Sequence, residues 1–350
     1  MRLGSLTLER RIVEPIWGGS RLAAWLDLPE PRPTRLGETW QVYDQNLVTA
    51  PPHAGQRLAD LVAQYGADLV GTRTMARYGA DFPLLAKFID AADRLSIQVH
   101  PDDAYAHRVE ARTGFHGKTE AWYILEAEPG ATVTYGLNRV CSRDEFAAAL
   151  ADGSVEDLMG QLPVAAGDVI FVPAGTIHAI NAGIVLFEIQ QKSDLTYRVY
   201  DYGRRDAKTG QLRELHLERA LDVSQFAPAP TGKITPLHLA PGRDLLIACP
   251  YFALERWQVA TPRALSTTPG SFEILTVLAG AGAVTWAEGS VTVTRGTSLV
   301  LPASLGAWSL APTTPDLTLL RADVPDLAAL EAQVRAVASA ERVAEVVRRM

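Results

Sequence analysis

The sequence predicts a mainly β protein built from two copies of one β-barrel module, with a few helices and a helical tail. Short apolar stretches separated by glycine and proline turns recur from the first residues to about residue 325, a pattern typical of many short strands. The turn Gly167–Pro173 has a counterpart in Gly296–Pro302, with five residues between glycine and proline in each. Glu120–Leu125 likewise resembles Glu273–Leu278. Such an internal repeat indicates a duplicated module.

The chain is long enough for two globular domains. Its 350 residues, of which 47% are hydrophobic and 21% charged, can bury two separate cores. The Pro-rich segment PAPTGKITP, which starts at Pro228, is expected to link them. We therefore predict a first β domain with helical insertions over residues 1–230, a second β domain over residues 231–325 and a helical tail over residues 326–350.

Hydrophobic spacing predicts helices at four places. Apolar residues recur at helical spacing over residues 56–78, where Gly66 and Gly71 are the expected breaks. The segment Ser142–Leu162 opens with the capping-box sequence SRDE and is expected to be one helix. A third helical stretch is expected over Leu215–Val223. The amphipathic tail is expected to be a helix, which could dock on the protein, mediate an oligomer or remain loose, and docking is favoured.

Apolar segments between turn residues predict the strands. A turn at Asp90–Arg94 separates two of them, and Pro129–Gly130 joins two others. Residues 103–117 are polar and are expected to form a loop or a short helix. Further strands are expected in PVAAGDVIFVPAGTIHAI, IVLFEIQQ, SDLTYRVYDYGR, YFALERWQV, SFEILTVLAGAGAVTWAEG and VTVTRGTSLVLPASLGAWSL.

Charge and composition exclude several classes of partner. The net charge of −7 and the pI near 5.6 give no basic surface for nucleic acid, and an anionic ligand would need locally placed Lys or Arg. No run of 18 apolar residues occurs, so no membrane span is expected. Two separate cysteines, Cys141 and Cys249, indicate neither a disulfide framework nor a cysteine zinc site. A cytoplasmic location is therefore expected.

Four potential metal ligands fall in two strand-and-turn motifs. Gln98 and His100 are two residues apart, so on a strand they point to the same face. Glu120 ends the same segment, and the turn of PAGTIH places His178 on the next extended stretch. For a lone histidine, an ordinary polar role near a strand end is the better interpretation. Four donors in two such motifs favour a divalent metal site.

The second copy of the repeat lacks these ligands. When the two glycine–proline turns are matched, the position of His178 falls on Ala307. No histidine follows His238 in the chain. The second copy is therefore expected to be a packing partner without a metal site.

Other charged and histidine residues have less specific interpretations. Lys87 is the only charge inside an apolar strand segment, and it could simply face solvent from a half-buried strand. His53, His107 and His116 are expected at the surface. His116 nevertheless lies close enough to the sequence GKTE to touch a ligand bound there.

Several motifs together resemble one enzyme family. GDVIFVPAGTIH is similar to the second cupin motif, and QVH followed by a distant glutamate is similar to a stretched form of the first. The segments LLAKFIDAADRLSIQVHPDD, GKTEAWYIL, PAGTIHAI and SDLTYRVYDYGR, with EPIWGG and GETW near the start, resemble the type I mannose-6-phosphate isomerases of the short bacterial kind. The resemblance covers residues 12 to 325 and leaves out the tail.

The resemblance implies a fold, a reaction and a metal. The fold is two cupin-like (jelly-roll) β-barrel domains, with the catalytic metal site in the first. The reaction is the interconversion of mannose 6-phosphate and fructose 6-phosphate. The metal is one Zn2+ per chain, although mixed oxygen and nitrogen ligands leave manganese, iron, cobalt and other divalent metals open. The implied ligands are Gln98, His100, Glu120 and His178.

The resemblance also implies which residues handle the substrate. Arg198 of SDLTYRVYD lies in the family's active site, and Lys118 is the lysine of GKTE. Glu188 occupies an acidic position between the last zinc histidine and that arginine. Arg204 stands where some relatives have a lysine. The residues implied near the substrate phosphate are Ser96 and Lys87.

The implied isomerisation moves a proton between C2 and C1 through a cis-enediol. It needs a Lewis acid, a group that shuttles the proton and an anchor for the phosphate. Glu188 or Lys118 could shuttle the proton, and Arg198 could stabilise the enediolate or hold the phosphate. Lys87, Ser96 and Arg204 could anchor the phosphate. Structural roles stay open, since Glu188 could pair with Arg198 or Arg204.

Three other functions remain as alternatives. The chain could isomerise another aldose or ketose phosphate, because hydroxyl stereochemistry is read by loops that the sequence does not place. It could be a non-catalytic sugar-phosphate-binding cupin, although such a protein would be expected to have lost part of the ligand set. An iron dioxygenase is disfavoured, because its substrates do not require the phosphate-binding Lys and Arg residues that this chain carries. A small-molecule sugar phosphate is thus the expected partner, and the chain could be a monomer or a homodimer.

Overall fold

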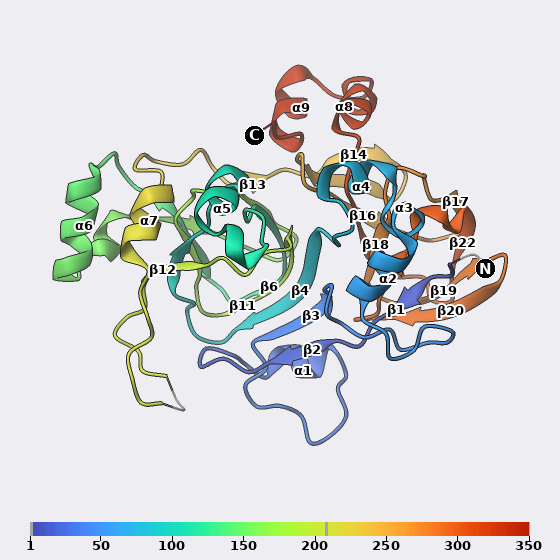
Figure 1. The fold of residues 1–350 in the computed structure, drawn as a ribbon, viewed down its shortest axis with the longest axis horizontal. Helices are drawn as coiled ribbons and strands as arrows, with labels where there is room; N and C mark the ends of the chain where they lie inside the picture. Colours follow the sequence, from blue (N-terminus) through green and yellow to red (C-terminus); the bar gives the residue numbers. More distant parts are fainter. Residues whose placement is uncertain (1–2, 207–208, 350) are drawn as a thin grey trace. The chain divides into compact units, whose positions relative to one another are not determined.

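The computed structural model describes residues 3–206 and 209–349, and it shows a mainly β protein (Figure 1). The fold class predicted from the sequence is confirmed, with jelly-roll sheets of the cupin type in both halves. None of the helices in the described residues is both long enough and apolar enough to cross a membrane.

The chain forms two compact units that are discontinuous in sequence. The chain passes from unit 2 to unit 1 between Lys233 and Ile234, inside the segment predicted as a linker. Short N-terminal pieces of the chain belong to each unit. The functional division expected at residues 1–230, 231–325 and 326–350 stays a prediction. Unit 1 comprises Met1–Arg11, Trp40–Ala86 and Ile234–Met350, and unit 2 comprises Ile12–Thr39 and Lys87–Lys233.

Two sheets carry unit 2. Their strands are β2 (Arg11–Val13), β3 (Glu38–Val42), β4 (Leu84–Ala91), β5 (Ile97–Val99), β6 (Glu120–Ala127), β7 (Thr132–Leu137), β8 (Met159–Pro163), β9 (Val169–Val172), β10 (His178–Ile180), β11 (Ile184–Gln191), β12 (Tyr197–Tyr200) and β13 (Lys233–Ile234). One sheet has the order β12-β5-β10-β7-β8. The other has the order β13-β9-β6-β11-β4-β3-β2, and its outer strands extend beyond unit 2.

The core of unit 2 lies between these sheets. Trp122 and Ile124 of β6 pack with Val133 of β7 and Leu186 of β11. Because side chains alternate along a strand, Glu120 points to the same face of β6 as Trp122. The glutamate therefore enters the interior at the end of the strand.

Three helices cover the outer side of the smaller sheet. They are α5 (Asp103–Val109), α6 (Arg143–Asp152) and α7 (Leu217–Val223), with 3₁₀ turns at Ala111–Thr113 and Val155–Leu158. The short helix α1 (Arg21–Trp25) lies against β4 of the larger sheet, where Trp25 packs on Phe88. Figure 1 shows α6 and α7 side by side next to β12. Phe146 of α6 and Leu221 of α7 share an apolar core with Val199 of β12.

Two local predictions in this unit can be compared with the structure. The two strands joined at Pro129–Gly130 form as expected, as β6 and β7, and they lie in different sheets. The helix expected over Ser142–Leu162 ends at Asp152, since Gly153 takes a left-handed conformation with φ of 84°. The residues after it form a 3₁₀ turn and β8. The N-terminal cap is confirmed, because Ser142 Oγ accepts a hydrogen bond from the backbone N–H of Glu145 at 3.0 Å.

Unit 1 repeats the same strand plan. Its strands are β1 (Leu6–Thr7), β14 (Leu237–Ala240), β15 (Arg243–Ala248), β16 (Ala253–Gln258), β17 (Arg263–Ser266), β18 (Glu273–Ala279), β19 (Ala281–Trp286), β20 (Gly289–Thr294), β21 (Ser298–Leu301), β22 (Ala307–Pro312) and β23 (Thr318–Asp323). They form sheets of order β1-β21-β18-β23-β16-β15-β14 and β17-β22-β19-β20. Leu275, Leu299 and Leu310 from both sheets meet in one core.

Six helical segments complete unit 1. The helical region predicted over residues 56–78 breaks at Gly66 and Gly71, as expected, because both glycines have positive φ. The segments are α2 (Leu58–Tyr65), α3 (Ala67–Val70), α4 (Thr72–Tyr78), a 3₁₀ turn at Ala303–Leu305, α8 (Leu327–Arg335) and α9 (Ala340–Val346).

The tail forms two helices where one was predicted (Figure 1). Val337 and Val343 are six residues apart and would lie on different faces of a continuous helix. A break lets the second apolar stripe turn inward, and Ser339 caps the new helix. The predicted docking is confirmed, since Arg348 donates from its backbone N–H to the carbonyl of Ala248 on β15 at 2.8 Å.

The strand registers of the two copies agree at the predicted metal site. In the first copy Glu120 of β6 pairs with Val172 of β9. In the second copy Glu273 of β18 pairs with Leu301 of β21, and each partner directly precedes the proline of its turn. His178 and Ala307 are the first residues of β10 and β22. The match inferred from the turns therefore holds in the structure.

Candidate active site

The four predicted metal ligands lie at neighbouring strand ends in unit 2. His178 starts β10 and pairs with Gln98 of β5 across the smaller sheet. Residues that pair across strands point to the same side. His100 directly follows β5, and Glu120 is the first residue of β6 in the larger sheet. Both sheets thus contribute to one cluster inside the barrel.

The donor atoms of this cluster are close together. His178 Nε2 lies 3.2 Å from Glu120 Oε1 and 3.3 Å from Gln98 Nε2. His100 Nε2 lies 3.4 Å from Glu120 Oε2. The two imidazoles and the carboxylate are at most 1% exposed. Rotating the Gln98 amide by a half-turn about its last side-chain bond exchanges its nitrogen and oxygen. The oxygen then faces His178 Nε2, and the set has two nitrogen and two oxygen donors.

The backbone fixes the tautomers of both imidazoles. His100 Nδ1 donates to the carbonyl of Leu195, and His178 Nδ1 donates to the carbonyl of Thr176, each at 2.9 Å. Because a carbonyl only accepts, each Nδ1 carries a proton, and in the neutral ring Nε2 then presents a lone pair. Metal-binding histidines are oriented in this way. Burial, assisted by the positive charge of Lys118, lowers the pKa of His100 to about 3, so its Nε2 is unprotonated at neutral pH.

Glu120 is a buried carboxylate that fits a cation. Neither of its oxygens has a hydrogen-bond partner of good geometry among the described residues, although nitrogen atoms lie 3.0 to 3.4 Å away. Burial acts to raise the pKa of Glu120, but the charged groups around it, with Lys118 the strongest, outweigh burial, and the pKa lies well below its usual range. An ionised carboxylate surrounded by imidazole lone pairs matches the ligand chemistry of a divalent metal.

Lys118 borders the donor cluster. Its Nζ lies 3.0 Å from Glu120 Oε2 and 3.0 Å from His100 Nε2. The backbone positions it, because the N–H of Lys118 donates to the carbonyl of Pro101 at 2.9 Å. Lys118 therefore places a nitrogen within reach of whatever binds beside the ligand atoms.

Glu188 and Lys87 form a buried network behind the cluster. Lys87 Nζ lies 3.0 Å from Glu188 Oε1 and 3.3 Å from Glu38 Oε2. Trp122 Nε1 donates to Glu188 Oε2 at 2.8 Å. Glu188 thus pairs with Lys87, not with Arg198 or Arg204 as the sequence had left open. Glu38, which belongs to GETW, was given no role from the sequence.

Opposing effects set the pKa values in this network. Burial and the negative charge of Glu120 raise the pKa of Glu188 above its usual value, against the lowering effect of Lys87. Burial acts to lower the pKa of Lys87, but the charges of Glu188 and Glu38 outweigh it and raise that pKa. Lys87 is therefore charged and closely held by carboxylates. A carboxyl group with a raised pKa next to a charged cluster is a common feature of sites that transfer protons.

Arg198 faces the cluster from the neighbouring strand. It pairs with Gln98 across β12 and β5, so the two side chains leave the sheet on the same side. Its Nη1 donates to the carbonyl of Glu214 at 2.7 Å, and its backbone N–H donates to His216 Nδ1 at 3.2 Å. Its Nε is buried and has no hydrogen-bond partner among the described residues. Burial lowers the pKa of Arg198.

Arg204 and Arg213 converge on one aspartate. Arg204 Nη2 lies 2.5 Å from Asp201 Oδ1, and Arg213 Nη1 lies 3.1 Å from the same oxygen. Arg204 also donates to the carbonyl of Arg94 at 2.5 Å. Arg204 Nη1 also lies 3.5 Å from Asp93 Oδ2, so two carboxylates face the two guanidinium groups. Arg213 was missed from the sequence, where the charge-rich run RELH around it was the available signal.

Ser96 is buried and directly precedes β5. It lies two residues before Gln98, and alternation along an extended segment directs both side chains to one face. The structure thus brings the four ligands and Lys118 together and places Glu188 and Lys87 behind them. Arg204 is held at the turn between β4 and β5.

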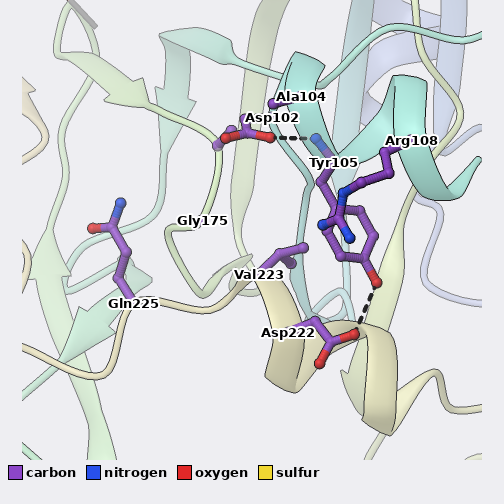
Figure 2. A pocket seen from close by; sticks show the side chains of 9 residues that line it. Asp102, Ala104, Tyr105, Arg108, Gly175, Asp222, Val223 and Gln225 are labelled. Atoms are coloured by element: carbon purple, nitrogen blue, oxygen red, sulfur yellow. Dashed lines mark hydrogen bonds between the residues drawn. The ribbon is translucent and has the colours of Figure 1, made fainter.

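A separate cavity of about 330 Å3 lies between α5 and α7 (Figure 2). Tyr105 and Arg108 of α5 line it, and Tyr105 donates from its hydroxyl to Asp222 of α7 at 3.1 Å. Asp102 and Gly175, which also line it, flank the metal-ligand motifs in sequence. None of the predicted site residues lines this cavity, so the predicted chemistry does not depend on it.

The second copy replaces the donor cluster with ion pairs. Glu273, the counterpart of Glu120, lies 2.7 Å from Arg321 Nη2. Ser266 pairs with Ala307 across β17 and β22, as Gln98 pairs with His178 in the first copy. Among residues 3–206 and 209–349, both side-chain groups suited to a metal lie in unit 2.

A jelly-roll fold with a buried donor cluster at the strand ends defines the class of the protein, a cupin. Its sequence matches two family models in different regions. Residues 6–131 match the phosphomannose isomerase type I catalytic domain, and residues 243–314 match the mannose-6-phosphate isomerase cupin domain.

Curated relatives cover most of the chain. It is 36% identical to a mannose-6-phosphate isomerase of Streptococcus mutans over 87% of this chain and 94% of that protein. It is also 36% identical to the mannose-6-phosphate isomerase ManA of Bacillus subtilis, over 85% of this chain and 92% of that protein. The chain therefore belongs to the type I phosphomannose isomerase family, and it is an enzyme of that family.

Solved structures agree with this assignment. A crystal structure of the mannose 6-phosphate isomerase from Bacillus subtilis is similar, with a TM-score of 0.80 and 29% identity over 91% of this chain and 99% of that chain. A variant of the phosphomannose isomerase from Salmonella typhimurium has a TM-score of 0.71 at 16% identity, over 91% of this chain and 99% of that chain. The second likeness supports the fold alone.

Proposed function

We propose that the chain interconverts mannose 6-phosphate and fructose 6-phosphate by moving a proton between C1 and C2 through a cis-enediol. The observation that carries this proposal is the buried cluster of Gln98, His100, Glu120 and His178 with Lys118 beside it. Membership of the type I phosphomannose isomerase family supports the substrate.

We propose that these four residues hold one divalent metal ion, with Zn2+ as the expected metal. Two observations support this assignment: the oxygens of Glu120 have no hydrogen-bond partner among the described residues, and the Nδ1 bonds of both histidines leave Nε2 facing the other donors. When bound, the ion supplies a Lewis acid that polarises the oxygens at C1 and C2 of the sugar. Manganese, iron and cobalt fit the same mixed donor set.

We propose Lys118 as the group that moves the proton, and Glu188 as the alternative. Lys118 is favoured by its position, because its Nζ is 3.0 Å from two of the proposed ligand atoms and would be close to a sugar bound beside them. Glu188 is favoured by its raised pKa. Lys87 would act through Glu188, since its ammonium lies against that carboxylate.

We propose that Arg198 stabilises the negative charge that develops on the enediolate. Its buried Nε, without a partner among the described residues, supports this role. Ser96 and Arg204, with Arg213, are proposed to attract and hold the phosphate. The two guanidinium groups that converge on Asp201 support this. Lys87 was also expected at the phosphate, but the two carboxylates around it favour a role in positioning Glu188.

We propose the following wider roles. Residues 1–230 would act as the catalytic domain, residues 231–325 as a metal-free scaffold and residues 326–350 as a docked tail. The enzyme would work in the cytoplasm on a small-molecule sugar phosphate, as a monomer or a homodimer. The acidic composition, without a basic surface, supports the expectation that it does not bind nucleic acid.

Isomerisation of fructose 6-phosphate by the metal-stripped and zinc-restored enzyme tests the main proposal. We expect no turnover after chelation, and mannose 6-phosphate formation when zinc is returned. His178→Ala, which removes a ligand, should stay inactive after zinc is returned, whereas His238→Ala at an exposed position should match the wild type. The proposal fails if substrate and metal bind but no metal-dependent mannose 6-phosphate forms. Glucose 6-phosphate as the product would instead indicate another aldose specificity.

A further inference from the structure

A second group of donor side chains lies outside the candidate active site. Asp103 and His107 are four residues apart on α5, so they share one face of the helix. His116 follows in the loop after the 3₁₀ turn. His107 Nε2 and His116 Nδ1 are 2.9 Å apart, and one ligand atom from each of the three residues lies within 4.8 Å of the others.

Close packing of the backbone brings His116 to the helix. Gly117 lies directly against the start of α5, where an added Cβ would come within 2.4 Å of the carbonyl carbon of Asp102. The loop is fastened on its other side, since Ser193 Oγ donates to the carbonyl of His116 at 2.8 Å. The backbone at His116 is therefore held in place by contacts on both sides.

The carboxylate of Asp103 is oriented as well. Its Oδ1 accepts hydrogen bonds from the backbone N–H of Gly117 and from Gln191 Nε2, each at 2.9 Å. These bonds use one oxygen and hold the plane of the carboxylate. Hydrogen bonds of this kind orient the carboxylate ligands of metal sites.

We propose that Asp103, His107 and His116 form a second metal site, which takes a divalent transition metal such as zinc, cobalt or nickel. Two imidazoles among three donors favour these ions over magnesium or calcium, which prefer oxygen. Two nitrogens that share one tetrahedral ion at about 2.0–2.1 Å lie about 3.3 Å apart. The observed separation of 2.9 Å therefore needs only a small movement.

The bound ion would connect α5 to the segment that carries the active-site lysine. Gly117 directly precedes Lys118, and Glu120 follows two residues later. An ion at this site would stabilise the loop over residues 114–117 without contacting the buried donors. The site is more exposed than the first, since His107 is exposed and the other two residues are partly buried.

Counting the bound metal tests the proposal without any assay of activity. The full chain is stripped with a chelator, dialysed against buffered zinc, and its zinc is measured per chain. We expect two ions in the wild type, one in His107→Ala and one in His116→Ala. His178→Ala should also retain one ion, because only the buried site is lost. The matched control is His238→Ala, another exposed histidine, which should retain two.

The decisive comparison is between His107→Ala and His238→Ala. Equal zinc content in these two variants overturns the second site, as does a single ion in the wild type. Hydrogen exchange gives a second measurement that does not depend on stoichiometry. Zinc should slow exchange of the amides in residues 114–117 of the wild type and leave them unchanged in His107→Ala. Slowing that persists in His107→Ala would likewise overturn the proposal.

Discussion

At the scale of single residues, main-chain carbonyls orient the two imidazoles of the donor cluster. The carbonyls of Leu195 and Thr176 take the Nδ1 protons of the two imidazoles. Glu120 remains ionised although it is fully buried, because the ammonium of Lys118 lies 3.0 Å from its Oε2. The cluster therefore combines neutral donors with one negative charge, and a dication bound there keeps a net positive charge.

Arg198→Ala separates catalysis from metal binding. We expect this variant to keep its metal, because the guanidinium bonds to the carbonyl of Glu214 and not to a ligand. Turnover should fall by about 100- to 1000-fold, as when a single charge-stabilising donor is removed from an active site. Metal analysis and steady-state kinetics on the same preparation measure both.

Arg198→Lys is the matched variant for this prediction. It keeps the charge but loses the planar fork, so a partial recovery of kcat is expected. If Arg198→Ala lost its metal, or turned over at nearly the normal rate, the proposed role of this arginine would be wrong.

The sequence could predict the donors but not their partners. Gln98 and His100 share a face by alternation alone, and the glycine–proline turn marks His178. The contacts of Lys87 with Glu38 and Glu188 join three strands whose order no local pattern encodes. Only the folded sheet brings these charges together, so a role at the phosphate was as compatible with the sequence as the buried network.

At the scale of elements, helix ends show what local signals specify. The cap at Ser142 was predictable because its hydrogen bond joins residues only three apart. The end of α6 at Gly153 was missed, because apolar residues continue into the 3₁₀ turn and β8 and resemble more helix. The interruption of the tail at Ser339 was missed for a similar reason.

Ser142→Ala tests the cap of α6. The variant leaves the N–H of Glu145 without its acceptor, and we expect the free energy of unfolding to fall by about 1 kcal/mol. Urea unfolding followed by circular dichroism measures this loss. Ser142→Asp supplies another acceptor at the cap and should unfold like the wild type. A loss of the same size in both variants would show that the cap hydrogen bond is not the cause.

At the scale of the whole molecule, the two copies of the module each bury a glutamate at the same strand end, but they surround it with different groups. The buried carboxylate at the end of β6 is surrounded by imidazoles, whereas its counterpart Glu273 is neutralised by Arg321. Arg321 also lies 3.2 Å from Asp323 and 3.7 Å from Glu255. Arg243 binds Glu255 through two hydrogen bonds of 2.6 and 2.7 Å. Unit 1 is thus held by an internal charge network.

Arg321→Met should strongly destabilise the protein. The substitution leaves buried carboxylates without a cation, and loss of one partner of a buried pair costs about 3–5 kcal/mol. Chemical unfolding at pH 7.5 measures the loss. The control is Arg57→Met, whose ion pair with Asp60 is exposed on both sides, and it should unfold nearly like the wild type.

The loss in Arg321→Met should depend on pH. In the wild type, burial acts to raise the pKa of Glu255, but Arg243 and Arg321 outweigh it and hold that pKa below its usual value. Glu255 therefore stabilises the fold above its unfolded pKa of about 4.3, and this contribution is lost as the pH falls through the folded pKa. Without Arg321 the pKa of Glu255 rises, so the deficit of the variant should shrink between pH 7.5 and pH 4.5. A deficit that grows on acidification would contradict this account.

The carbonyl anchors on the two histidines have a consequence for metal supply. Because hydrogen bonds to Leu195 and Thr176 already aim both rings, the pocket keeps its shape when an ion leaves. A preformed pocket with mixed donors accepts several first-row dications, and availability then decides between them. The metal found in the purified enzyme should therefore reflect the growth medium, and cells starved of zinc should yield protein loaded with another ion.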